Sequence, residues 1–164
     1  MSTTTTTRTQ TGPVTQPAQG AVVVVGVFLI VIGIIGFIPG ITTGVDKITF
    51  GGPFSGALVF NIFQTSVLQN AVHILLGLAA FGAARKRASS TLYLLGMSTL
   101  FFGFWLYGLL FNGSFAGNIF PFNYPDYAFN VSMGFALMIL AAATSSLALK
   151  GTKYDDDDSY GLFS

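Results

Sequence analysis

The sequence contains no cysteine and very few charged residues. Of its 164 residues 8% are charged and 52% are hydrophobic, whereas a soluble domain carries roughly a quarter charged residues. The missing cysteines exclude disulfides, thiol catalysis, iron–sulfur clusters and cysteine-based zinc sites. A formal net charge of +1 offers no basic surface for nucleic acid. The class that remains is a small integral membrane protein, whose first partner is the lipid bilayer.

Four long apolar runs predict four transmembrane helices. A helix that crosses a bilayer needs roughly 20 apolar residues, because its backbone groups find no hydrogen-bond partner in hydrocarbon. No Lys, Arg, Asp or Glu lies inside any run. The predicted spans are residues 21–38, 60–84, 91–111 and 131–149. The predicted fold class is therefore an all-α integral membrane protein, with four transmembrane helices in an antiparallel bundle.

The two ends of the chain lack apolar runs. Residues 1–20 are rich in Thr, Gln and Pro and predict a disordered tail. The first span is long and ends at Pro39-Gly40, which favours a retained helix over a cleaved signal peptide. Residues 150–164 hold four consecutive aspartates at 155–158 and predict an acidic, solvated C-terminal tail.

The basic residues predict an orientation. Arg85, Lys86 and Arg87 lie in the short loop between the second and third spans, and all other basic residues but one fall on the same side of the membrane. Because cytoplasmic loops carry an excess of Lys and Arg, we expect this loop and both termini in the cytoplasm. Residues 39–59 and 112–130 face outward, as interfacial caps or, alternatively, as a binding surface.

The second span holds the densest set of polar residues within the membrane. Ser66, Gln69, Asn70 and His73 share one face at 100° per residue. Polar groups at membrane depth face protein or a water-filled cavity, so we expect this face to point into the bundle. His73 is the only histidine. It either bonds a hydroxyl on a neighbouring helix and helps hold the bundle, or carries protons or contacts a ligand.

These residues are too few for the common metal and catalytic sites. A structural zinc site needs four ligands, usually Cys or His, and one histidine cannot supply both axial ligands of a haem. The nearest carboxylates, Asp46 and Asp126, are expected in the outer loops, whereas His73 is expected at mid-membrane or deeper. We therefore predict no catalytic residues, no metal and no cofactor, and a protein that is not an enzyme.

Small residues punctuate the first and last spans. Gly26, Gly33 and Gly36 lie in the first, and an Ala- and Ser-rich cluster lies at residues 141–146. Small residues let helix backbones approach closely, and packing drives helix association in lipid. The sequence leaves two roles open for them, packing within the bundle and a homodimer face.

Three stretches resemble a known family. They read GFIPGITTGVDKITFGG, IFQTSVLQNAVHILLGLA and WLYGLL. Together they resemble a bacterial membrane family called domain of unknown function 4383, over roughly residues 22–142. The most specific pieces are FIPG at 37–40 and the pattern Asn70-x-x-His73-x-x-x-Gly77. The resemblance implies a four-helix, multi-pass protein of the bacterial inner (plasma) membrane and adds no reaction.

The chain departs from the family pattern at two positions. The family commonly has a histidine where this chain has Gln69, and a second one near the start of the last helix, where this chain has Asn130. If the family uses paired histidines for metal, haem or protons, this chain has lost that chemistry. Amides keep the hydrogen bonds of an imidazole, but they do not titrate or replace it as a strong ligand.

The expected function is structural or accessory. We predict a non-enzymatic inner-membrane protein that acts as a homo-oligomer or as a subunit of a larger membrane complex. The alternative is a small transporter or channel subunit, with a polar path along the face of Gln69, Asn70 and His73. A third class is a membrane enzyme, or a quinone or haem binder.

Overall fold

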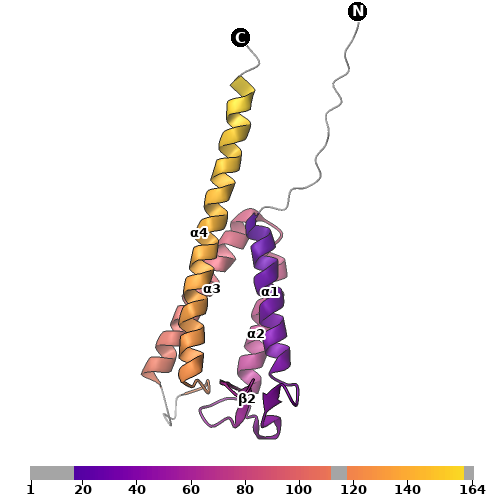
Figure 1. The fold of residues 1–164 in the computed structure, drawn as a ribbon, viewed down its shortest axis with the longest axis vertical. Helices are drawn as coiled ribbons and strands as arrows, with labels where there is room; N and C mark the ends of the chain where they lie inside the picture. Colours follow the sequence, from indigo (N-terminus) through magenta and orange to yellow (C-terminus); the bar gives the residue numbers. More distant parts are fainter. Residues whose placement is uncertain (1–16, 112–117, 161–164) are drawn as a thin grey trace, which may run out of the picture.

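Four α-helices, which run alternately in opposite directions, account for most of the structure (Figure 1). The computed structural model describes residues 17–111 and 118–160, with side chains as far as residue 145. The helices are α1 (Pro17–Ile35), α2 (Val67–Ala83), α3 (Arg87–Leu110) and α4 (Tyr124–Tyr160). Within this part of the chain α1, α3 and the first 22 residues of α4 are long and apolar enough to cross a membrane, and α2 is shorter. The prediction of a mostly helical protein with four helices is thus confirmed.

The second helix begins later than the predicted residue 60. Strands β2 (Ala57–Val59) and β3 (Phe63–Thr65) form an antiparallel hairpin there, with Leu58 opposite Gln64. The turn between them holds two residues with positive φ, Phe60 at 52° and Asn61 at 58°. A short apolar run does not distinguish a strand from a helix by composition, which is why the predicted span included this hairpin.

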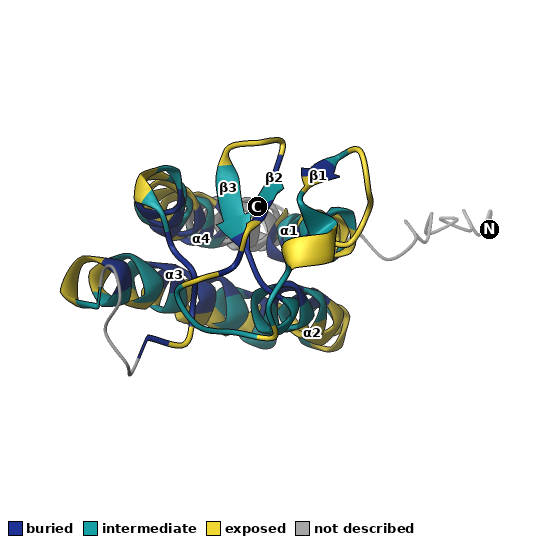
Figure 2. Ribbon diagram, turned by 90° about the horizontal axis from the view of Figure 1, so that it is seen from below, coloured by how far each residue is buried: buried dark blue, intermediate teal, exposed yellow. Residues whose placement is uncertain are grey.

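A small sheet covers one end of the bundle. Strand β1 (Thr42–Thr43) pairs antiparallel with β2, so that the order is β1-β2-β3, and the short 3-10 helix η1 (Val45–Lys47) follows β1. Figure 2 looks onto this end and shows the sheet beside α1 and α4. The first predicted outer loop is therefore an ordered cap rather than a plain connection.

The other helix boundaries also differ from the predicted ones. Helix α1 begins at Pro17 and ends at Ile35, so the last residues of the predicted tail 1–20 are helical. Helix α3 begins at Arg87 rather than at residue 91. Helix α4 begins at Tyr124 rather than at residue 131, and it continues as far as Tyr160.

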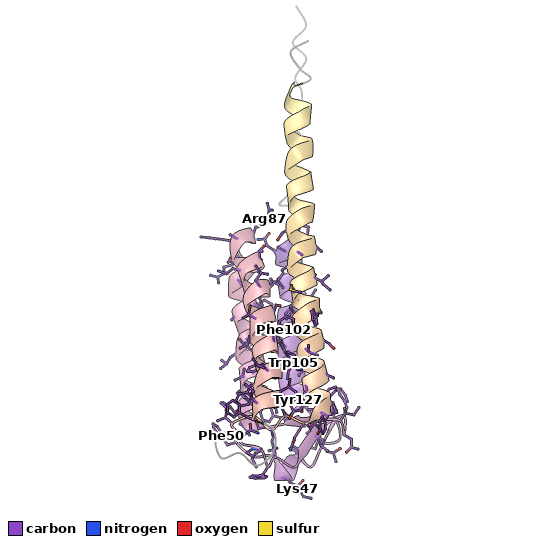
Figure 3. The ribbon with its side chains drawn as sticks, turned by 90° about the vertical axis from the view of Figure 1, so that its left-hand side faces the viewer. Lys47, Phe50, Arg87, Phe102, Trp105 and Tyr127 are labelled. Atoms are coloured by element: carbon purple, nitrogen blue, oxygen red, sulfur yellow. The ribbon has the colours of Figure 1, made fainter. Side chains whose placement is uncertain are left out.

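The predicted tail 150–164 is thus helical over most of its length, and α4 projects beyond the other helices (Figures 1 and 3). Residues 1–16 and 161–164 of the predicted tails lie outside the described residues.

The helices form two close pairs, α1 with α2 and α3 with α4. Glycines make the first pair possible. A Cβ atom on Gly26 would lie 2.5 Å from the Cβ of Ala80, and one on Gly77 would lie 2.6 Å from the carbonyl oxygen of Gly26. Since the two backbones touch here, these glycines have the role of packing within the bundle, one of the two roles that the sequence leaves open.

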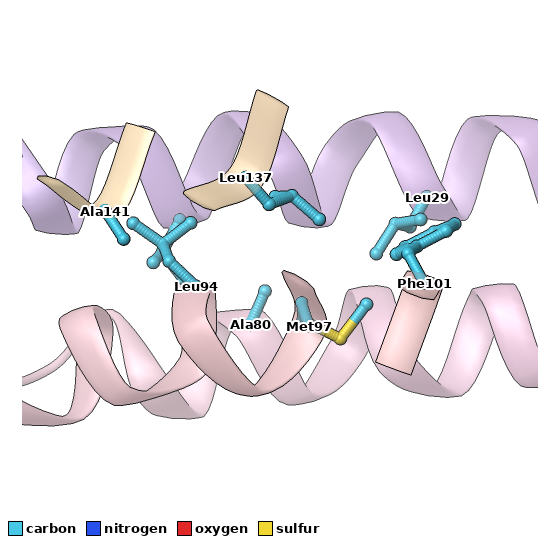
Figure 4. Close-up of a cluster of buried hydrophobic side chains, with 8 residues drawn as sticks. Leu29, Ala80, Leu94, Met97, Phe101, Leu137 and Ala141 are labelled. Carbon is cyan, nitrogen blue, oxygen red and sulfur yellow. The ribbon is translucent and has the colours of Figure 1, made fainter. Parts of the chain in front are cut away.

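Large apolar residues occupy both the interior and the outer surface of the bundle. All four helices contribute to a buried cluster, which Figure 4 shows in close-up and which includes Leu29, Ala80, Leu94, Phe101 and Leu137. The outer surface carries large exposed apolar side chains, among them Val24, Val27, Leu75, Leu92, Leu106 and Ile139. Apolar patches of this extent are rare on soluble monomers and typical of protein or membrane interfaces.

Replacement of Gly77 by alanine should destabilise the bundle. The added methyl group would meet the backbone of α1, and overpacking typically costs about 1–3 kcal/mol. Gly96→Ala is the matched control, because among the described residues nothing outside its own stretch of helix lies within 4 Å of a Cβ atom there and alanine favours a helix. We expect the thermal unfolding temperature in detergent to fall for Gly77→Ala only. Equal changes in both variants would contradict the close contact between α1 and α2.

Candidate functional site

A cavity of about 370 Å³ lies beneath the sheet, between α1, α2, the β2–β3 hairpin and the start of α4. Most of its walls are apolar, with side chains from α1, the hairpin and α4. Its polar lining residues are Gln64, Thr65, Gln69, Asn70, His73 and Asp126. Three of the four residues of the predicted polar face thus lie in one cavity together with a carboxylate.

The start of helix α2 sets the positions of the polar side chains that this helix contributes to the cavity. The hydroxyl oxygen of Ser66 accepts a hydrogen bond from the backbone N–H of Gln69 at 3.2 Å, so Ser66 is the N-cap of the helix. Ser66 is fully buried but does not line the cavity. Gln69 and His73 are one helical turn apart, and Asn70 lies beside them on the same face. Ser66 therefore positions the polar face and is not part of it.

Asn70 is the most tightly enclosed polar residue of the cavity, with 1% of its surface exposed. Its Oδ1 accepts a hydrogen bond from the hydroxyl of Thr65 at 2.6 Å. Its amide packs against Gly36, where a Cβ atom would overlap the amide group. Asn70 Nδ2 has no hydrogen-bond partner among the described residues. The asparagine on α2 thus depends on a glycine just after α1.

His73 hydrogen-bonds its own helix. Its Nδ1 lies 3.0 Å from the carbonyl oxygen of Gln69. Because a carbonyl can only accept, Nδ1 carries the hydrogen, and Nε2 of the neutral ring is then an acceptor. The predicted bond to a hydroxyl on a neighbouring helix is not found among the described residues. The ring lies instead beside that of Phe101 on α3, with 6.4 Å between centroids.

Asp126 is the residue that sequence reasoning placed wrongly. It was expected in an outer loop, away from His73, but it lies in the first turn of α4, is 3% exposed and lines the same cavity. Its Oδ2 accepts from the backbone N–H of Asn123 at 2.9 Å, and its own N–H donates to Asn123 Oδ1 at 3.1 Å. This is a capping box, and the sequence Asn-Tyr-Pro-Asp at 123–126 was the signal for it.

The same carboxylate joins the two halves of the chain. Asp126 Oδ2 also accepts a hydrogen bond from the backbone N–H of Gln64 in β3, at 3.1 Å. In addition, the side-chain amide of Asn123 donates to the carbonyl oxygen of Ile62 at 2.8 Å. These bonds hold the hairpin against the start of α4. They therefore close the cavity on that side.

The remaining predicted residues lie elsewhere. Arg85, Lys86 and Arg87 are exposed at the turn between α2 and α3, at the opposite end of the bundle from the sheet, as the labels of Arg87 and Lys47 in Figure 3 show. Asn130 is buried in α4 but does not line the cavity. Among the described residues, no group of three or more His, Asp or Glu side chains is placed to hold a metal ion.

A second cavity, of about 390 Å³, lies at the same end of the molecule. It is lined more by polar groups, from the loops and from the first turn of α4, and Gln64 lines both cavities. Next to it lies an aromatic cluster of Phe120, Phe122 and Tyr127, against which Trp105 and Tyr107 pack. Figure 3 shows Trp105 and Tyr127 near this end. These aromatic contacts hold the chain before α4 onto α3.

The fold defines a class of protein, a small helical bundle with helices apolar enough for a membrane and a polar cluster near one end. Within that class, the model of the family described as domain of unknown function (DUF4383) matches residues 19–143. The match covers most of the chain, so the chain belongs to this family. Neither the curated proteins nor the solved structures contain a match.

Loss of the Asp126 carboxylate should loosen the contact between the hairpin and α4. In Asp126→Ala two partly buried backbone N–H groups lose their acceptor, which costs up to about 1–3 kcal/mol each. Asp46→Ala, at an exposed position in η1, is the control. We expect faster amide hydrogen exchange at Gln64 and Asn123 in the first variant only. Unchanged exchange at Gln64 would show that Asp126 does not hold the hairpin.

Proposed function

We propose that the chain is a four-span protein of the bacterial inner membrane, non-enzymatic, with a structural or accessory role in a larger membrane assembly. The observation that carries the proposal is the distribution of apolar residues. Large apolar side chains such as Val24, Leu75 and Leu92 are exposed on the outside of the bundle, while the close helix contacts inside use glycine and alanine. In lipid such a surface is in its preferred surroundings, because packing rather than burial from water holds helices together there.

Helix α2 is the span that needs a separate argument. Its 17 residues cover about 26 Å at 1.5 Å per residue, slightly less than the roughly 30 Å of a hydrocarbon core. The hairpin that precedes it continues the apolar surface, since Phe60 and Ile62 are exposed. We therefore infer that α2 and the hairpin cross the membrane together.

The charge distribution supports an orientation with both termini in the cytoplasm. Arg85, Lys86 and Arg87 lie at one end, beside the start of α1, and Lys47 lies at the sheet-covered end (Figure 3). By the excess of basic residues on the cytoplasmic side, the sheet and the cavity then belong to the outer half of the membrane.

Cysteine labelling tests the orientation directly, because the chain has no cysteine of its own. Asp46 and Ala88 are exposed at the two ends of the bundle. With Asp46→Cys, intact cells should react with a membrane-impermeant maleimide. With Ala88→Cys they should react only after permeabilisation. The reverse result would invert the orientation, and labelling of both in intact cells would rule out a spanning bundle.

Two features support an accessory role. Gly96 and Gly103 lie two turns apart on the outer face of α3, and nothing is within 4 Å of a Cβ atom at either. Another helix can approach closely at such a face. Helix α4 also continues past the other helices as far as Tyr160 (Figure 1), which gives a partner on the cytoplasmic side a projecting helix.

The transporter alternative has weaker support from the interior of the bundle. A polar path along Gln69, Asn70 and His73 would have to continue between the helices. Instead Phe101 and Leu29, both fully buried, fill the interior beside and beyond His73. One copy of the chain therefore supports a closed bundle better than a pore. Flux through reconstituted liposomes that is lost in His73→Ala would favour the alternative.

Photo-crosslinking in native membranes tests the accessory role. A photoreactive amino acid at Gly96 should form a defined covalent product with another membrane protein or a second copy of the chain. The same amino acid at Leu75, which is exposed on α2, is the control and should give lipid adducts only. Uncrosslinked monomer from both positions would contradict the accessory role.

A further inference from the structure

The floor of the cavity holds polar atoms that the protein itself does not satisfy. Gln69 Oε1 and Asn70 Nδ2 are buried and have no hydrogen-bond partner among the described residues. His73 Nε2 also has none there, because the bond of this ring is made by Nδ1. Buried polar groups are nearly always paired, and in a bilayer no bulk water replaces a missing partner. These two buried exceptions, beside the acceptor Nε2 of His73, indicate a polar site at this end of the cavity.

The types of these atoms define the group that would complete the site. His73 Nε2 is an acceptor, since Nδ1 donates to the carbonyl oxygen of Gln69. The matching group must therefore donate a hydrogen. A hydroxyl does so, whereas an ether or a ketone only accepts.

The walls define the rest of the molecule. They are formed by apolar side chains from α1 and the hairpin, and Phe28 and Val31 of α1 are 41% and 49% exposed on the outer surface of the bundle. The cavity thus reaches the surface that we assign to lipid. Its volume of about 370 Å³ lies at the lower end of the roughly 300–1,000 Å³ of small-molecule pockets.

We propose that this cavity binds an apolar molecule that carries a hydroxyl group, which enters from the lipid phase. The hydroxyl donates to His73 Nε2, and the apolar part lies along Phe28 and Val31 of α1. The hydroxyl belongs either to a lipid alcohol or glyceride or to a reduced quinone, which share this chemistry. The accessory role proposed above is not needed for this site, which is a property of one chain.

The carboxylate of Asp126 favours a different class of ligand, a molecule with an ammonium group. This carboxylate also lines the cavity and would attract an ammonium group. However, Oδ2 already accepts two backbone N–H groups, and the carboxylate lies at the N-terminus of α4, where the helix dipole favours its charge. We therefore expect the hydroxyl rather than an amine to be preferred, and the experiment below includes both.

The single histidine makes the hydroxyl contact measurable. Protein labelled with ¹⁵N-histidine gives the nitrogen resonances of one imidazole, that of His73. Nanodiscs of phosphatidylcholine are suitable, because this lipid has no O–H or N–H donor. Addition of 1-decanol should shift the resonance of Nε2 in a saturable way and leave that of Nδ1 nearly unchanged. Decyl methyl ether, which cannot donate, should bind at least tenfold more weakly.

A pair of tryptophan variants tests the location. Val31→Trp fills the cavity from α1, whereas Val24→Trp changes an exposed residue on the same face of α1, two turns away, that does not line the cavity. The decanol-induced shift should be lost in Val31→Trp and kept in Val24→Trp. Equal thermal unfolding temperatures of the two variants would show that the loss is not a loss of fold.

The outcomes separate the possibilities. Monodecanoylglycerol and decylubiquinol are added in turn. The compound that shifts the Nε2 resonance at the lower concentration shows whether the ligand is a glyceride or a reduced quinone. The absence of any shift with all three hydroxyl compounds would overturn the proposal and leave water as the occupant. Equal binding of the ether, tighter binding of decylamine, or an unchanged shift in Val31→Trp would each overturn it as well.

Discussion

The contact between the backbones of α1 and α2 is the constraint on which the rest of the structure depends. Gly26 and Gly77 leave no room for a side chain on either helix where they meet. Directly after the end of α1 at Ile35, Gly36 leaves the same space for the amide of Asn70. The close approach therefore places the polar start of α2 directly against α1. In lipid, where packing drives association, this contact also explains why α1 and α2 form a close pair.

The second constraint is the carboxylate of Asp126. It caps α4 through Asn123 and accepts the backbone N–H of Gln64 from the hairpin, so one side chain sets where α4 begins and where the hairpin lies. The cavity exists because these elements meet around it. A buried carboxylate with two backbone donors is stable only while both remain in place, which couples the sheet-covered end of the molecule to the helix pair α3 and α4.

Helical periodicity predicted that Gln69, Asn70 and His73 share one face, and in the structure the three residues line one cavity. Periodicity did not assign their partners. Ser66 is a cap rather than part of the face, and His73 bonds the backbone of its own helix rather than a neighbouring helix. A partner on another element depends on which residues the fold brings near, and spacing within one segment carries no such information.

The sequence by itself determined the class of the protein, the number of helices, the polar face and the family, because each is written in local composition or in short motifs. The tertiary structure decided three other features. The residues at 57–65 form a hairpin and not the start of a helix. Asp126 lies beside the polar face and not in a distant loop. The polar face borders a cavity that reaches the outer surface. The place of Asp126 depends on contacts between residues about 60 positions apart, such as Gln64 and Asp126, and the hairpin on the pairing of Leu58 with Gln64. Local composition shows only which residues avoid water.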